Sequence, residues 1–181
     1  MVRIVMVENL AENVVQTNLV KNLILPDLNK ALTYQNSDLV QRFCKEHKVT
    51  TFEAEEIFME LKKWLWLIAV AAIERKANIN HVPKKLVIDK PTIILDEMWH
   101  TFLCFTFEYQ KYCNENFGFF IHHQPTPFEV NQFIATSLKD DPKFVMKRLK
   151  KQYEYVYDKL GEETLIKWYD IFPKKYLVCL K

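Results

Sequence analysis

Residues 50–76, TTFEAEEIFMELKKWLWLIAVAAIERK, determine the fold. Thr50 and Glu53 form a capping-box pattern, in which each side chain can accept a hydrogen bond from the other residue's backbone N–H. Apolar residues then recur at helical spacing, and residues 64–73 are apolar on every side. A helix that is apolar all round is buried by other elements. We therefore expect one long central helix over residues 51–76, with the core built around it.

The composition supports a helical fold and excludes several functional classes. Of the 181 residues, 49% are hydrophobic and only two are glycines, Gly118 and Gly161. So few glycines argue against a β-sandwich or barrel and against a Gly-rich phosphate loop. The formal net charge of +2 is too small to predict a nucleic acid or an anionic membrane as partner. An unidentified protein or small molecule remains as the expected partner.

The spacing of the cysteines indicates a reducing compartment, and the lengths of the apolar runs indicate neither a secretory signal nor a membrane span. Four cysteines, at positions 44, 104, 113 and 179, are irregularly spaced and contain no CxxC pair. The apolar run at residues 1–7 is too short for a secretory signal. The longest apolar run, residues 64–73, is about half the length of a membrane-spanning helix. We expect a cytoplasmic protein with free thiols and no transmembrane segment.

Cap and breaker residues predict further helices on both sides of the central one. Thr126-Pro127 and Asp141-Pro142 each combine an N-cap residue with a proline at the first helical position, and Gly161 is a helix end. The expected helices are residues 14–25, 37–47, 127–138, 142–160 and 162–171. Residues 85–88 and 119–121 are short apolar runs that can pair as strands or simply pack. The prediction is an all-α, compact single-domain bundle of about six to eight helices over residues 1–181.

Side chains capable of binding a metal gather in one segment after the central helix. It contains Asp96-Glu97-Met98-Trp99-His100, Tyr109, Cys113, Gly118 and His122-His123. Thr92 can cap a helix on which Asp96 and His100 stand four residues apart on one face. On a continuous helix, however, His100 and Cys113 would lie roughly 20 Å apart along the axis. Because zinc ligands lie about 2.0 to 2.3 Å from the ion, these two residues can share a metal only if the helix breaks.

The sequence contains such a break. Thr106 can act as the N-cap of a new helix with Glu108 in its first turn, and Gly118 can supply a left-handed C-cap that reverses the chain. We expect a helix-elbow-helix motif over residues 93–117. It would fold His100 and Cys113 toward each other, and the reversal at Gly118 would bring a histidine back.

The first functional hypothesis is a divalent-metal site, with zinc as the expected ion. Its ligands would be Asp96, His100, Cys113 and His123, with His122 as the alternate, because adjacent residues of an extended chain point in opposite directions. Asp96 can also orient His100 instead of binding the metal itself. Four protein ligands would make the site structural, whereas an open position would allow hydrolysis. Trp99 and Tyr109 would form an aromatic wall beside it.

Two other hypotheses use the same residues without a metal. In the first, Asp96, His100, Tyr109 and His123 form a buried hydrogen-bond network in a protein-interaction module. The aromatic tail, Trp168, Tyr169, Phe172 and Tyr176, would then be either a contact surface or core. In the second, Cys113 is a nucleophile with His100 or His123 as its base.

The segment also resembles a known family. Leu95-Asp96-Glu97-Met98-Trp99-His100-Thr101-Phe102, Phe105-Thr106-Phe107-Glu108-Tyr109, Cys113 and Phe117 to Pro125 are similar to the signature stretch of the glycine-rich domain-containing protein-like family. The similarity covers about residues 50–127, with the C-terminal helices of residues 127–171 beyond it.

This resemblance implies a small bacterial-type member without the Gly-rich tail. The signature positions that it implies are Asp96, Trp99, His100, Tyr109, Gly118 and His123, and Cys113 matches the bacterial form. The resemblance thus supports a site at these residues and leaves the reaction open.

Overall fold

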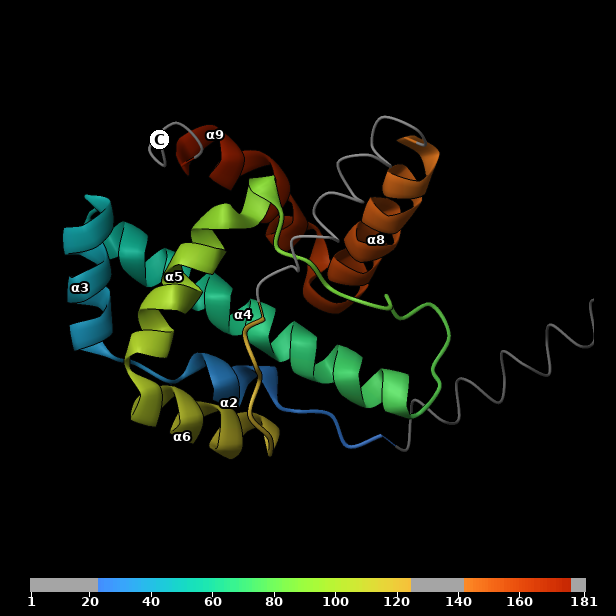
Figure 1. Cartoon of the computed structure of the whole chain (residues 1–181), viewed down its shortest axis with the longest axis horizontal. Helices are drawn as coiled ribbons and strands as arrows, with labels where there is room; N and C mark the ends of the chain where they lie inside the picture. Colours follow the sequence, from blue (N-terminus) through green and yellow to red (C-terminus); the bar gives the residue numbers. More distant parts are fainter. Residues whose placement is uncertain (1–22, 125–141, 177–181) are drawn as a thin grey trace, which may run out of the picture.

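Helix α4 (Thr51–Lys76) crosses the middle of the molecule, as Figure 1 shows. The structure is a computed structural model that describes residues 23–124 and 142–176. The capping box is present: Glu53 N donates to Thr50 Oγ1 at 3.3 Å, and Thr50 N donates to Glu53 Oε2 at 2.8 Å. Leu61, Leu65 and Ala69 are fully buried along α4. The predicted central helix is confirmed.

All regular elements of the described residues are helical. They are α2 (Leu28–Leu32), α3 (Ser37–His47), α4, η1 (Lys90–Thr92), α5 (Ile93–Cys104), α6 (Thr106–Phe117), α8 (Pro142–Ile166), η2 (Lys167–Ile171) and α9 (Phe172–Tyr176). Residues 85–88 and 119–121 pack without forming strands. The predicted all-α class is confirmed. Of the described helices, none is both long and apolar enough to cross a membrane.

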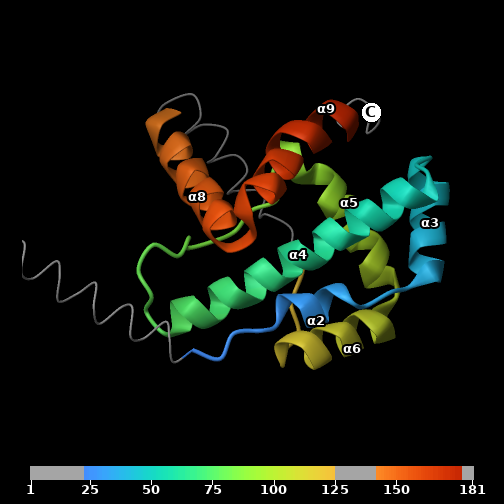
Figure 2. The same ribbon diagram turned by 180° about the vertical axis from the view of Figure 1, so that it is seen from behind.

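The other helices surround α4. Helices α2 and α6 lie on one side of it and α8 and α9 on the other, while α5 crosses it; the view from behind in Figure 2 agrees. Helix α3 packs on α4 and α5. After α4 ends, residues 77–89 return along it to the start of α5. This returning loop forms one wall of the cavity described below.

Buried charges attach the C-terminal helices to α4. Glu60 and Glu74 of α4 are each about 1% exposed. Glu60 accepts a hydrogen bond from Trp168 Nε1 at 2.9 Å, and Glu74 accepts one from the Tyr155 hydroxyl at 2.7 Å. Trp168, Phe172 and Tyr176 are buried, so these tail rings belong to the core and form no contact surface.

The predicted elbow is confirmed, although its caps differ in detail. Phe105, at φ −93° and ψ 61°, separates α5 from α6, so Thr106 is the first helical residue and not the N-cap. Thr92 makes no side-chain cap for α5, because its hydroxyl bonds Asp89 instead. Gly118 ends α6 in the left-handed region at φ 78°.

Two helix ends also differ from the prediction. Gly161 breaks the helical geometry within α8 at φ 82° and ψ 173°, and the helical turns that follow it continue to Tyr176 rather than ending at residue 171. At the other end of the chain, residues 23–25 are not helical. The remainder of the helix expected at 14–25, and the whole of the one expected at 127–138, lie outside the described residues.

Candidate metal centre

Asp96 and His123 meet across the reversal at Gly118. Asp96 lies in the first turn of α5, and His123 lies in the extended segment that follows α6. His123 Nε2 is 2.9 Å from Asp96 Oδ1, and both side chains are mostly buried, at 15% and 22% exposed. A histidine nitrogen and a carboxylate oxygen at this distance form a hydrogen bond, and both atoms are good ligands for a divalent metal.

His100 adds a third ligand atom to the pair. It stands one turn after Asp96 on α5, with Nε2 at 3.7 Å from Asp96 Oδ2, and its ring centre is 4.7 Å from that of His123. One ligand atom from each of these residues lies within 4.8 Å of the other two. The ligand atoms of a tetrahedral zinc ion lie roughly 3.4 Å apart. The three side chains must therefore come closer together to bind zinc, and His100 is the most exposed of them.

Cys113 lies outside this group. Among the described residues, the group that can hold a metal ion comprises Asp96, His100 and His123. Cys113 is fully buried on the core face of α6, where burial raises the pKa of its thiol. The elbow thus folds α6 back without turning Cys113 toward His100. A thiol that is enclosed and held neutral is also a poor nucleophile.

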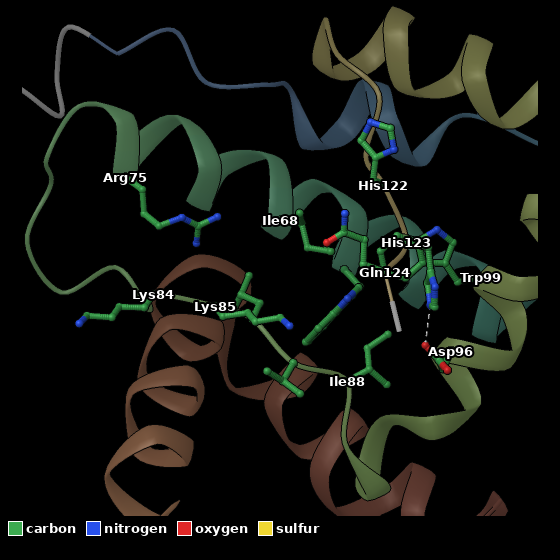
Figure 3. A pocket seen from close by; sticks show the side chains of 13 residues that line it. Ile68, Arg75, Lys84, Lys85, Ile88, Asp96, Trp99, His122, His123 and Gln124 are labelled. Carbon is green, nitrogen blue, oxygen red and sulfur yellow. Dashed lines mark hydrogen bonds and ion pairs between the residues drawn. The ribbon is translucent and has the colours of Figure 1, made fainter. Parts of the chain in front are cut away.

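The two adjacent histidines point in different directions. The His123 ring packs edge-on against Trp99, with ring centres 4.4 Å apart. The His122 ring packs against Phe120 at 4.8 Å and is exposed. Figure 3 shows His123 directed toward Asp96 and His122 directed away from it. The extended backbone therefore delivers His123 to the cluster.

A buried hydrogen-bond chain holds the His123 segment in place. The Tyr109 hydroxyl accepts from Trp99 Nε1 at 3.0 Å and donates to the carbonyl oxygen of Ile121 at 2.7 Å. Tyr109 is 1% exposed, and burial raises the pKa of its hydroxyl. These hydrogen bonds link α5, α6 and the extended segment at Ile121, two residues before His123. Trp99 and Tyr109 thus fix the position of the segment that carries His123.

A cavity of about 290 Å³ opens beside the cluster. Its lining residues are Trp64, Ile68, Arg75, Lys84, Lys85, Leu86, Val87, Ile88, Asp96, Trp99, His122, His123 and Gln124. Figure 3 shows the contributions of α4, the returning loop and the segment after α6. Two members of the cluster therefore face a space in which a small molecule fits.

The cavity walls contain residues that the sequence did not single out. Trp64, Ile68 and Arg75 recur on one face of α4, which is a periodic signal, but the same spacing also describes an ordinary core face. The returning loop is held by Gln152 of α8, whose side chain accepts from Val87 N at 2.9 Å and donates to Val87 O at 3.0 Å. Only the tertiary structure brings α8 to this loop.

The fold and the cluster define the protein as a helical domain with an Asp-His-His group beside a cavity. A family model described as UCP032817-like matches residues 29–140, more than half of the chain. The chain belongs to this UCP032817-like family. The matched range contains the cluster and every residue that lines the cavity. Comparison with curated proteins and with solved structures found no match.

Proposed function

We propose that Asp96, His100 and His123 bind one divalent metal ion, with zinc as the preferred ion, and that the site is hydrolytic. The observation that carries this proposal is the grouping of three ligand atoms within 4.8 Å at the edge of a cavity. Structural zinc sites are closed by four protein ligands, whereas catalytic sites keep a position for water or substrate. Three protein ligands beside a cavity fit the second arrangement.

A metal ion in this position would supply a nucleophile. Binding to zinc lowers the pKa of water to about 7. Held by Asp96, His100 and His123, the ion would activate a water molecule for attack on the electrophilic carbon or phosphorus of a substrate, and the displaced group would leave with a proton. Trp99 and Tyr109 take no part in these steps and orient His123.

The resemblance to the glycine-rich domain-containing protein-like family supports the same residues. Asp96, His100 and His123 are all among the signature positions that this resemblance implies. We propose that all the signature positions contribute to the site. Trp99, Tyr109 and Gly118 hold the segment that carries His123 in place, and Asp96, His100 and His123 bind the ion.

Elemental analysis tests whether the protein binds zinc. The protein is purified without added metal and is then dialysed against zinc before it is measured. We expect stoichiometric zinc in the native protein and its loss in Asp96→Asn, His100→Ala and His123→Ala. His122→Ala is the matched control, since its ring points away from the cluster, and it should retain zinc. Absence of zinc, together with thermal unfolding that a chelator leaves unchanged, would leave a metal-free hydrogen-bond network as the explanation.

Cys113→Ala separates a closed site from an open one. Cys113 is not in the group of three, so the variant should keep its zinc, and a loss equal to that in His123→Ala would mean a structural four-ligand site.

The reaction is tested by zinc-dependent release of 4-nitrophenolate from 4-nitrophenyl acetate and 4-nitrophenyl phosphate. The native protein must first be shown to hold zinc that His123→Ala loses. If this zinc-loaded protein then cleaves neither ester, the hydrolytic part of the proposal is wrong.

A further inference from the structure

The charged side chains around the cavity are mostly basic. Arg75, Lys84 and Lys85 line it, and Asp96 is the one carboxylate among its described lining residues. His123 already engages that carboxylate. In the described parts of the chain no acidic side chain pairs with any of the three basic ones. The cavity therefore favours an anion.

Arg75 and Lys84 lie at one end of the cavity and the cluster at the other, with Lys85 between them (Figure 3). Figure 3 shows Arg75 and Lys84 on the side away from Asp96 and His123. Eleven residues of α4 separate Trp64 from Arg75, which corresponds to about 16 Å along the helix axis. Arg75 is half-buried, and its Nη1 donates to the Pro83 carbonyl oxygen at 3.0 Å. This bond holds the guanidinium against the loop and leaves other N–H groups for a ligand.

Apolar side chains form much of the remaining lining. They are Trp64, Ile68, Leu86, Val87, Ile88 and Trp99. Trp64 is 1% exposed, and its indole Nε1 is a buried donor without a hydrogen-bond partner among the described residues. The lining thus suits an apolar body.

We infer that the cavity binds a small organic anion with an apolar body, whose carboxylate or phosphate group is held by Arg75 and Lys85. Attraction to these two cations selects the charge, and the apolar lining selects the body. The inference rests on the proposed function only in placing the reacting bond at the metal cluster. Binding of the anion itself requires no metal and can be measured without one.

Calorimetric titration with hexyl phosphate and with hexanoate, into both zinc-free and zinc-loaded protein, tests this inference. At least one of the two anions should bind zinc-free protein, and the tighter one identifies the headgroup. Arg75→Gln combined with Lys85→Ala should weaken its binding by roughly tenfold or more, since each lost contact is a charge-assisted hydrogen bond. Lys85→Ala alone, which removes an exposed side chain, covers the case in which Arg75→Gln perturbs folding.

Lys76→Ala is the matched control. Lys76 follows Arg75 on α4, is exposed and does not line the cavity, so the variant should bind the anion as the native protein does. Hexylammonium and 1-hexanol are the control ligands. The inference is overturned if either of them binds as tightly as the anions, if neither anion binds, or if the double variant leaves anion binding unchanged.

The zinc-free and zinc-loaded arms separate this inference from the proposed function. Anion binding that appears only with zinc and is unchanged in the double variant would place the anion on the metal, which overturns the inference and leaves the metal site intact. If the protein takes up no zinc but binds the anion, and the Arg75 and Lys85 double variant weakens that binding, the result would support the inference and refute the proposed function.

Discussion

His123 Nε2 lies 2.9 Å from Asp96 Oδ1, although 27 residues of chain separate them. The contact closes a loop that runs through α5, the elbow at Phe105, α6 and the reversal at Gly118. Each of these features must be in place for the two side chains to meet. The candidate metal centre is therefore a product of the helix-elbow-helix motif, and changes in the motif should be detectable as changes in metal affinity.

Tyr109→Phe should weaken metal binding although Tyr109 is not a proposed ligand. The variant removes the hydroxyl that bonds Trp99 Nε1 and the Ile121 carbonyl, and so loosens the segment that carries His123. Loss of a group that orients a metal ligand typically costs 10- to 100-fold in affinity. Competition with a zinc indicator would measure it.

Tyr112→Phe is the control for this change. Tyr112 is also buried on α6, and its hydroxyl donates to the Ala31 carbonyl at 3.3 Å, away from the cluster. Both variants should lose about 1 to 2 kcal/mol of stability, but only Tyr109→Phe should lose zinc affinity. Equal zinc affinities in the two variants would contradict the positioning role of Tyr109.

Gln152→Leu should destabilise the protein and loosen the cavity wall. Gln152 is 3% exposed, and its amide bonds both the N–H and the carbonyl of Val87. A leucine leaves these two backbone groups unsatisfied, at a cost of about 1 to 3 kcal/mol for a buried group. Urea unfolding measures the stability, and faster hydrogen exchange at Val87 would report the loosened loop. An unchanged exchange rate at Val87 would show that the loop holds without Gln152.

Lys62 should make a contribution to stability that rises with pH between about 8 and 10.5. Lys62 is 3% exposed, and its ammonium donates to the carbonyls of Leu32 and Tyr34, each at 2.7 Å. Burial lowers its pKa from 10.5 to about 8. Within this window Lys62 binds its proton more tightly in the unfolded chain than in the folded one, so its contribution to the free energy of unfolding increases as pH rises.

Lys62→Met isolates this contribution. The other titrating groups are common to both proteins, so the difference between their pH profiles reports Lys62. Native protein should gain up to about 3 kcal/mol relative to the variant from pH 8 to pH 10.5. Urea unfolding at several pH values measures both profiles. Parallel profiles would mean that Lys62 keeps an ordinary pKa in the folded state.

The two glycines should differ in their tolerance of alanine. An added Cβ meets no atom within 4 Å at either position, so only the backbone conformation matters. Gly118 is in the left-handed helical region, where alanine costs about 1 kcal/mol. Gly161 has φ 82° and ψ 173°, a region essentially restricted to glycine, so Gly161→Ala should cost about 2 to 3 kcal/mol. Thermal unfolding should therefore show a larger loss for Gly161→Ala, and the reverse order would contradict this reasoning.

The sequence by itself determined the features that depend on neighbouring residues. The capping box at Thr50, the apolar surface of residues 64–73 and the turn at Gly118 are local, and each appears in the structure as expected. The elbow was expected because a straight helix cannot bring His100 and Cys113 together, and it is present although Cys113 lies outside the group. Its position was wrong by one residue, since Phe105 and not Thr106 precedes α6.

The tertiary structure decided which side chains meet. Cys113 has a ligand's chemistry, but it is fully buried in the core. The neighbouring Tyr112 packs the same helix against Ala31 and Phe102, which are distant in sequence. The cavity likewise joins α4, the returning loop and the segment after α6, which no periodicity connects. Spacing along a helix records which face a residue occupies, whereas what that face contacts depends on the whole chain.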